Sequence, residues 1–339
     1  MEGRPIMKKL LCTALCFISF FTSFFTYAGG GITHMFLAEE SIQQLPDAKL
    51  RHLLLDNIDA YRVGAYYPDS GYISNNLYGE DSHWDPFIEA FADYINETYP
   101  NFMEQNPKLV AFLFGCAAHR VSDQIMHQTF YPVIRDKDFN GDGDTAHSYG
   151  DAGIDLLINA DKNLWLAYPS TWWVPVKDLV NVYRRMGFDQ YSADQIIWGN
   201  AVLSVTGYGE RLISAPAYLF LQWKMPWTAA HYYDWPVGGI TMDEKKVAEY
   251  QTRLWERLNS KTTKRALSAS TPAQKAHTGI KNQANDYNFA ENALKSGAIG
   301  VSVTPHDDGS VDIGNPFVKQ EAEFRALLNQ LLAKITQGK

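Results

Sequence analysis

The sequence predicts an all-α protein, with a multi-helix domain followed by a small C-terminal appendage. Apolar residues recur at helical spacing through most of the chain, whereas alternating strand patterns are confined to a weak pair at 299–303 and 311–313. The 339 residues are 46% hydrophobic and 14% aromatic, which is enough to bury a sizeable core. This composition excludes a disordered tail, a collagen-like rod and a small disulfide scaffold.

The predicted elements follow one another with Pro, Gly, Asn and Asp at their breaks. Helical spacing or composition marks seven segments: 39–58, 84–98, 107–128, 146–159, 176–186, 192–223 and 242–258. A polar stretch at 261–285 predicts a linker, and 315–335 predicts a closing amphipathic helix. We therefore divide the chain into a signal peptide (1–28), a domain (29–258) and a polar linker with the C-terminal appendage (259–339).

The N-terminus has the pattern of a secretory signal peptide. Lys8 and Lys9 precede an apolar run over 10–25, and Ala28 stands before three glycines. A membrane anchor is the alternative, but the run is short for a transmembrane helix. We expect cleavage near Gly29, a secreted or periplasmic protein, and no transmembrane segment in the mature chain.

The net charge and the cysteine positions further limit the kinds of protein that this chain can be. Lys and Arg number 30 against 38 Asp and Glu, a net charge of −8, so we expect no stable nucleic-acid complex. A nuclease is not excluded, because bound metal ions supply local positive charge. Cys12 and Cys16 leave with the signal peptide, and Cys116 lies in an apolar helical run. We expect Cys116 to be a core residue and the mature chain to lack an intramolecular disulfide.

Two histidine motifs have the spacing of metal ligands. His119, Asp123 and His127 are four residues apart, so they share one stripe of a helix. His147 and Asp151 repeat this spacing at the start of the next helical segment. Imidazole and carboxylate are the ligands of catalytic zinc sites, and a carboxylate between imidazoles can bridge two metals.

Three further candidates lie outside these helices. His34 follows the glycine run, Asp69 follows a proline, and His83 precedes a tryptophan. Each taken alone is more typical of a polar loop residue than of a metal ligand.

The motifs together resemble the zinc-dependent phospholipase C family, and most closely the N-terminal catalytic domain of glycosylphosphatidylinositol-specific phospholipase D. They occur in the family's order: Gly-Ile-Thr-His34, Tyr-Pro-Asp69, Ser-His83-Trp-Asp-Pro-Phe, His119-x3-Asp123-x3-His127 and Ala-His147-Ser-Tyr-Gly-Asp151. The resemblance implies the compact all-helical fold that bacterial phospholipase C shares with single-strand-specific nucleases. It also makes residues 29–258 a zinc-dependent phospholipase-like catalytic domain.

The resemblance further implies two to three zinc ions. One would be held by Asp69, His83, His119 and Asp123; a second by His127, His147 and Asp151; and a third by His34, with Asp123 bridging back to the first. Asp69 would also orient or deprotonate the attacking water. The implied function is an exported phosphodiesterase that hydrolyses phospholipids at a membrane surface, in the manner of a phospholipase C or D.

Some residues depart from the family pattern. Choline-preferring members place Tyr directly after the loop acid, where this chain has Ser70, so choline specificity does not carry over. Bacterial phospholipase C has Glu at the last ligand position, where this chain has Asp151. The N-terminal Trp that completes the third zinc site in the bacterial enzymes and nucleases is replaced by a glycine-rich segment. Two alternatives stay open: a single-strand nuclease or nucleotide phosphatase on the same scaffold, and a secreted metal-binding or adhesion protein.

A second metal hypothesis concerns calcium. Asp136, Asp138, Asn140 and Asp142 match the first half of a calcium loop, with oxygen ligands at alternate positions and a glycine for the turn. Position twelve of that loop, normally Glu, is His147. A solvated Asp/Gly-rich turn explains the segment equally well.

Overall fold

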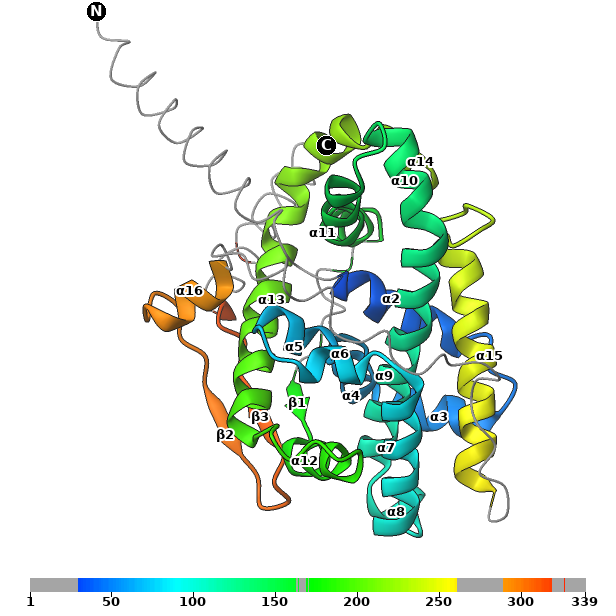
Figure 1. Cartoon of the computed structure of the whole chain (residues 1–339), viewed down its shortest axis with the longest axis vertical. Helices are drawn as coiled ribbons and strands as arrows, with labels where there is room; N and C mark the ends of the chain where they lie inside the picture. Colours follow the sequence, from blue (N-terminus) through cyan, green and yellow to red (C-terminus); the bar gives the residue numbers. More distant parts are fainter. Residues whose placement is uncertain are drawn as a thin grey trace, which may run out of the picture.

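The chain is built from helices around a central bundle, with one small sheet at the side (Figure 1). The computed structural model describes residues 30–162, 164, 169, 171–260, 289–318 and 326. Within them, the prediction of an all-α protein is confirmed. The predicted signal peptide, the linker at 261–285 and most of the helix at 315–335 lie outside the described residues.

Two helices cross at the centre with their backbones almost touching. These are α4 (Ile58–Tyr66) and α9 (Pro107–Ile125). A Cβ on Gly115 would lie 2.1 Å from the carbonyl oxygen of Tyr61, and one on Gly64 would lie 2.2 Å from that of Phe112. Only glycine allows this approach, which brings the middle of α9 against α4.

Other helices enclose this crossing. Helix α2 (Gly31–Ile42) packs on both α4 and α9, and α15 (Ile240–Asn259) packs on α2 and α9. On the opposite side of the view, α13 (Ala193–Lys224) packs against α11 (Gly143–Asp161) and α5 (Asp69–Ile73) (Figure 1). The bundle therefore holds α2, α5, α9 and α11 around one interior region.

Capping residues set where the main helices begin. The side chain of Asn106 accepts a hydrogen bond from the Leu109 amide (3.1 Å) ahead of α9, whose first residue is a proline. Ser192 and Gln195 form a reciprocal capping box at the start of α13. After Ile125, α9 continues through a π-helical turn, η1 (Met126–Phe130), into α10 (Tyr131–Asp138).

The predicted helix over 39–58 is wrong, because the chain breaks there. Helix α2 ends at Ile42 and α3 (Ala48–Asp56) starts after Pro46 and Asp47. Proline has no amide hydrogen to donate, and Asp47 accepts from the Leu50 amide (2.9 Å) as an N-cap. The remaining helices are α6 (Tyr78–Ser82), α7 (Asp85–Thr98), α8 (Phe102–Gln105), α12 (Val176–Arg185), α14 (Pro226–His231) and α16 (Phe289–Lys295).

The sheet joins the helical domain to the C-terminal segment. Its strands are β1 (Trp172–Val174), β2 (Val303–Pro305) and β3 (Val311–Ile313), in the antiparallel order β1-β3-β2. The predicted strand at 311–313 is confirmed, whereas its hairpin partner lies at 303–305 instead of 299–303. The hairpin thus extends a sheet that the helical domain begins (Figure 1).

The interior also accounts for the cysteine. Cys116 is fully buried on α9 with a free thiol, as the sequence predicts. Within the described ranges, every helix is too short or too polar to cross a membrane.

Candidate metal centre

The described residues contain three groups of His and Asp side chains able to hold a metal ion. In each group the candidate ligand atoms lie within 4.8 Å of one another. The groups are Asp69–His83–His119, His34–His119–Asp123 and His127–His147–Asp151. The fold thus gathers all eight predicted zinc ligands, which the sequence spreads over more than a hundred residues.

The first group is buried and its two imidazoles are oriented by backbone carbonyls. His83, directly after α6, places Nδ1 2.6 Å from the carbonyl oxygen of Gly79. His119 on α9 places Nδ1 2.8 Å from the carbonyl oxygen of Ala65 on α4. When each ring is neutral and its Nδ1–H donates to the carbonyl, the lone pair of Nε2 points toward the group's centre.

The resulting arrangement fits a cation. The two Nε2 atoms are 3.0 Å apart, and Asp69 Oδ1 lies 3.4 Å from that of His83 and 3.7 Å from that of His119. Three atoms that carry lone pairs therefore converge on one point. Asp69 Oδ2 is buried and has no hydrogen-bond partner among the described residues. Neutral imidazoles with a carboxylate are the ligand set of catalytic zinc, so these residues fit zinc.

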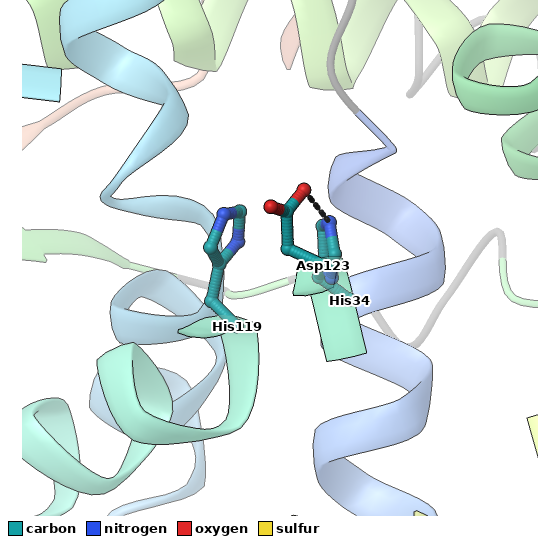
Figure 2. Close-up of side chains that lie close together, drawn as sticks. All are labelled: His34, His119 and Asp123. Atoms are coloured by element: carbon teal, nitrogen blue, oxygen red, sulfur yellow. Dashed lines mark ion pairs between the residues drawn. The ribbon is translucent and has the colours of Figure 1, made fainter. Parts of the chain in front are cut away.

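The second group shares His119 with the first. His34 on α2 and Asp123 on α9 point toward each other and toward His119 (Figure 2), with 3.9 Å between His34 Nε2 and Asp123 Oδ1. His34 Nδ1 lies 2.7 Å from Ser122 Oγ, whose hydroxyl donates to the Ala118 carbonyl (3.0 Å). The ring therefore donates through Nδ1 and leaves Nε2 as an acceptor.

Burial keeps the two imidazoles of this second group neutral. Burial lowers the pKa of His34 to about 4 and that of His119 to about 3. Both rings are consequently in the metal-binding form at neutral pH.

The third group is the most exposed. His127 lies in the π-helical turn η1, with Nε2 3.0 Å from Asp123 Oδ1 and 3.9 Å from Asp151 Oδ1. His147 Nδ1 lies 3.2 Å from Asp151 Oδ2, and the Tyr131 hydroxyl donates to the other oxygen of Asp151. Burial lowers the pKa of His127, but the carboxylates of Asp123 and Asp151 overcome this and raise it to about 10. A metal ion bound here would take the place of that proton.

Asp123 connects the groups. Its Oδ1 faces His127 on one side and His34 on the other. Burial raises the pKa of Asp123, but the neighbouring His127 lowers it well below its usual range, so the carboxylate is ionised. The resemblance places Asp123 with Asp69, His83 and His119 and as a bridge to His34. The structure instead groups it with His34 and His119, and its Oδ1 lies nearest to His127.

Asp155 is a supporting residue that the motifs did not single out. It lies one turn after Asp151 on α11, is fully buried, and accepts hydrogen bonds from the amides of Ile32 and Thr33 (2.8 Å each) and from the Thr33 hydroxyl. These bonds cap α2 and fix the turn that carries His34. Asp155 follows Asp151 by four residues, just as Asp151 follows His147. This four-residue spacing in the sequence could have identified it.

Glu210 on α13 is a second such residue. It is buried, and its Oε1 has no hydrogen-bond partner among the described residues. Burial raises the pKa of Glu210 well above its usual range, and the charges of Asp155, Asp69 and Asp151 add to this effect. No spacing in the sequence connects it to the ligands, because α13 contributes none of them.

The calcium hypothesis gains no support. Asp138 accepts hydrogen bonds from the amides of Trp227 (3.0 Å) and Thr228 (2.8 Å), so it caps α14. Asp142 accepts from Thr145 (3.1 Å) and caps α11, and Asp136 pairs with the neighbouring Arg135 (2.8 Å). Asn140 and Gly141 have φ angles of 51° and 89°, which is the backbone of a tight turn. Asp138 and Asp142 thus cap the helices α14 and α11.

Comparison with known proteins agrees with this geometry. Residues 33–186 match the family model of zinc dependent phospholipase C. The chain is 33% identical over 226 residues to phosphatidylinositol-glycan-specific phospholipase D of Homo sapiens and 30% identical over 196 residues to that of Dictyostelium discoideum. These matches cover 61% and 55% of this chain but only 27% and 20% of the relatives, so the chain spans about a quarter of their length.

No solved structure matches the chain. The family match includes all eight residues of the three groups, from His34 to Asp151. The resemblance that the motifs predict is thus confirmed: residues 33–186 of this chain resemble the zinc-dependent phospholipase C family.

Proposed function

We propose that this chain is an exported zinc-dependent phosphodiesterase that hydrolyses phospholipids. The observation that carries the proposal is the convergence of eight imidazole and carboxylate ligands into three adjoining groups. The family match supports the same reaction class. The named activity of the relatives supports a phospholipid substrate, cleaved in the manner of a phospholipase D or C.

Each part of the site has a task in this reaction. Zinc ions, when bound, polarise the phosphoryl group and make water more acidic. Asp69 turns Oδ1 toward the Nε2 atoms of His83 and His119 and keeps Oδ2 buried, without a hydrogen-bond partner among the described residues. In this proposal, that oxygen accepts the proton of the attacking water. The water oxygen then forms a bond to phosphorus, the phosphorus–oxygen ester bond breaks, and the released alcohol takes up a proton.

The proposal extends to location and metal content. The basic and apolar pattern of residues 1–28 supports export. The three groups support two to three zinc ions, with His119 and Asp123 shared between neighbouring positions. The substrate would be met at the surface of a membrane.

The proposal is tested by incubating the zinc-loaded chain with mixed phospholipid vesicles and identifying products by mass spectrometry. We expect diacylglycerol or phosphatidic acid, and its loss on addition of a chelator. Asp69→Asn should lower the turnover number by about 100-fold or more, because it removes the proton acceptor. Asp136→Asn is the matched control, since Asp136 is exposed and pairs with the neighbouring Arg135.

Two results would contradict the proposal. One is the absence of any lipid product from a chain shown to contain zinc. The other is unchanged turnover in Asp69→Asn. Hydrolysis of single-stranded nucleic acid in place of lipid would favour the nuclease alternative.

A further inference from the structure

The last two turns of α13 are apolar on both of their faces. Ala217 and Leu221 are buried and face the helical bundle. Leu219 and Trp223 lie on the outer face and are each 75% exposed, and Phe220 beside them is 39% exposed. A helix at the surface of a globular domain ordinarily has polar residues on its outer face. We call Leu219, Phe220 and Trp223 the α13 stripe.

The members of the α13 stripe form one continuous apolar surface. Leu219 and Trp223 are four residues apart, so they lie on the same side of the helix, one turn from each other. The rings of Phe220 and Trp223 have 5.8 Å between their centroids. Single exposed apolar residues are ordinary, whereas large apolar side chains grouped in this way are typical of an interaction surface.

The α13 stripe borders the helix that carries two ligands of the third metal group. Helix α13 packs against α11 (Figure 1). At the end of α13, Lys224 Nζ lies 5.4 Å from the ring centroid of Tyr149 on α11. In the sequence, Tyr149 stands midway between the ligands His147 and Asp151. The stripe is therefore continuous with the side of the molecule on which the most exposed metal group lies.

The charges next to the stripe do not form a basic patch. Hydrogen bonds from Thr145 lower the pKa of Asp142, and the charge of Lys224 contributes to the same shift, so the two charges lie near each other. Asp144 on the same turn is exposed, and the whole chain has a net charge of −8. A strongly anionic partner is thus disfavoured at this surface. Its apolar side chains fit the uncharged apolar interior of a bilayer.

We propose that the α13 stripe inserts into the surface of a phospholipid membrane and holds the metal centre against it. The indole ring of tryptophan is favoured at the level of the lipid head groups, and leucine is typical of the buried face of helices that lie in the membrane interface. The choice of a membrane as the partner rests on the proposed phospholipase function, whose substrate is a membrane lipid. Insertion of the stripe brings the neighbouring third metal group toward the lipid phosphates.

Membrane binding is tested by co-sedimentation of the zinc-loaded full chain with phosphatidylcholine vesicles. We expect Trp223→Ala and Leu219→Ala each to weaken binding by about five- to tenfold, because each removes most of a large apolar side chain from the membrane. Trp223→Phe keeps a ring and should weaken binding by less than about threefold. A tenfold increase in salt concentration should change binding by less than about twofold, since charge attraction is not involved.

Leu55→Ala is the matched control for Leu219→Ala. Leu55 is 49% exposed on α3, so the change removes the same atoms from another surface and should leave vesicle binding unchanged. The stripe variants should keep the melting temperature and zinc content of wild type. They should hydrolyse vesicle lipid more slowly, in proportion to the lost binding. On a short-chain phosphatidylcholine below its critical micelle concentration they should match the wild-type rate.

Three results would overturn the proposal. One is wild-type vesicle binding by both Trp223→Ala and Leu219→Ala. The second is a lower melting temperature of both variants, which would show that another part of this chain covers the stripe. The third is a wild-type dimer that dissociates in Trp223→Ala, which would assign the stripe to a second copy.

The two readouts separate this inference from the function on which it rests. If the chain bound vesicles through the stripe but hydrolysed no lipid, the proposed function would fail and the membrane-binding surface would stand. If it hydrolysed the short-chain lipid but bound no vesicles, the membrane-binding surface would fail and the phospholipase would stand.

Discussion

For single residues, hydrogen bonds to Nδ1 decide which nitrogen of three histidines faces the interior of the site. The carbonyl oxygens of Gly79 and Ala65 lie against Nδ1 of His83 and His119, and the Ser122 hydroxyl lies against Nδ1 of His34. These contacts direct the Nε2 atoms of His83, His119 and His34 inward. The site is therefore preorganised by main-chain geometry that the ligand spacing alone does not reveal.

Asp243 gives a prediction on the pH dependence of stability. It is fully buried near the start of α15, and neither carboxylate oxygen has a hydrogen-bond partner among the described residues. Burial raises its pKa from 3.8 to about 8. Between these two values the fold keeps a proton that the unfolded chain releases, so the free energy of unfolding falls as pH rises, by up to about 1.4 kcal/mol per pH unit.

Asp243→Asn removes this titration and should make stability less dependent on pH. Urea unfolding followed by circular dichroism at pH 5 and pH 7.5 measures the effect, with Asp234→Asn as the exposed control on the preceding loop. We expect the variant to gain stability relative to wild type as pH rises. Equal pH dependence in variant and wild type would show that Asp243 is not protonated in the fold.

The sequence reveals a functional residue when its partners lie only a few residues away along the chain. His119, Asp123 and His127, like His147 and Asp151, have partners four residues away, so spacing alone singles them out. Asp155 acts on the amides of Ile32 and Thr33, more than a hundred residues distant, and Glu210 approaches the site only because α13 packs on α5 and α11. Such roles arise from tertiary packing, which spacing does not encode.

Among the elements, the close crossing of α4 and α9 is what aligns His119 with the Ala65 carbonyl. Gly115→Ala should lower the free energy of unfolding by about 1–3 kcal/mol, because the new methyl group would meet the Tyr61 carbonyl oxygen and the Ala65 amide nitrogen. Because the methyl group would push α4 and α9 apart, Gly115→Ala should also weaken zinc binding.

The matched control is Gly143→Ala at the start of α11. A Cβ there has only Arg135 Cδ within 4 Å, at 3.9 Å, so it should be tolerated or slightly stabilising. Chemical unfolding and zinc titration of both variants measure the two effects. If Gly115→Ala were as stable as Gly143→Ala, the crossing would not have the rigidity that we assign to it.

The long elements were predictable and the short ones were not. Periodicity places α7, α9, α11, α12, α13 and α15 within a few residues of their bounds. The one-turn helices α5 and α6, which carry Asp69 and lead to His83, are too short for any period to be recognised. The π-helical turn that holds His127 is likewise a local departure from regular spacing, of a kind common at functional sites.

In the whole molecule, the fold brings together ligands that begin on α2 and end on α11. Helices α13 and α15 pack on opposite sides of this interior, and the β2–β3 hairpin extends the sheet that starts at β1 (Figure 1). The overall class followed from composition and periodicity, whereas the pairing of the C-terminal hairpin with β1 required contacts between residues far apart in sequence. The cluster of three sites is thus a property of the complete bundle.

The assignment of zinc to these groups is tested by the metal content of the purified chain. The chain would be purified without chelator, loaded with zinc, desalted and measured by inductively coupled plasma mass spectrometry. The zinc assignment predicts two to three zinc ions per chain, and a loss of at least one in His119→Ala, because His119 belongs to two groups. Fewer than two zinc ions in the correctly folded wild-type chain would contradict it.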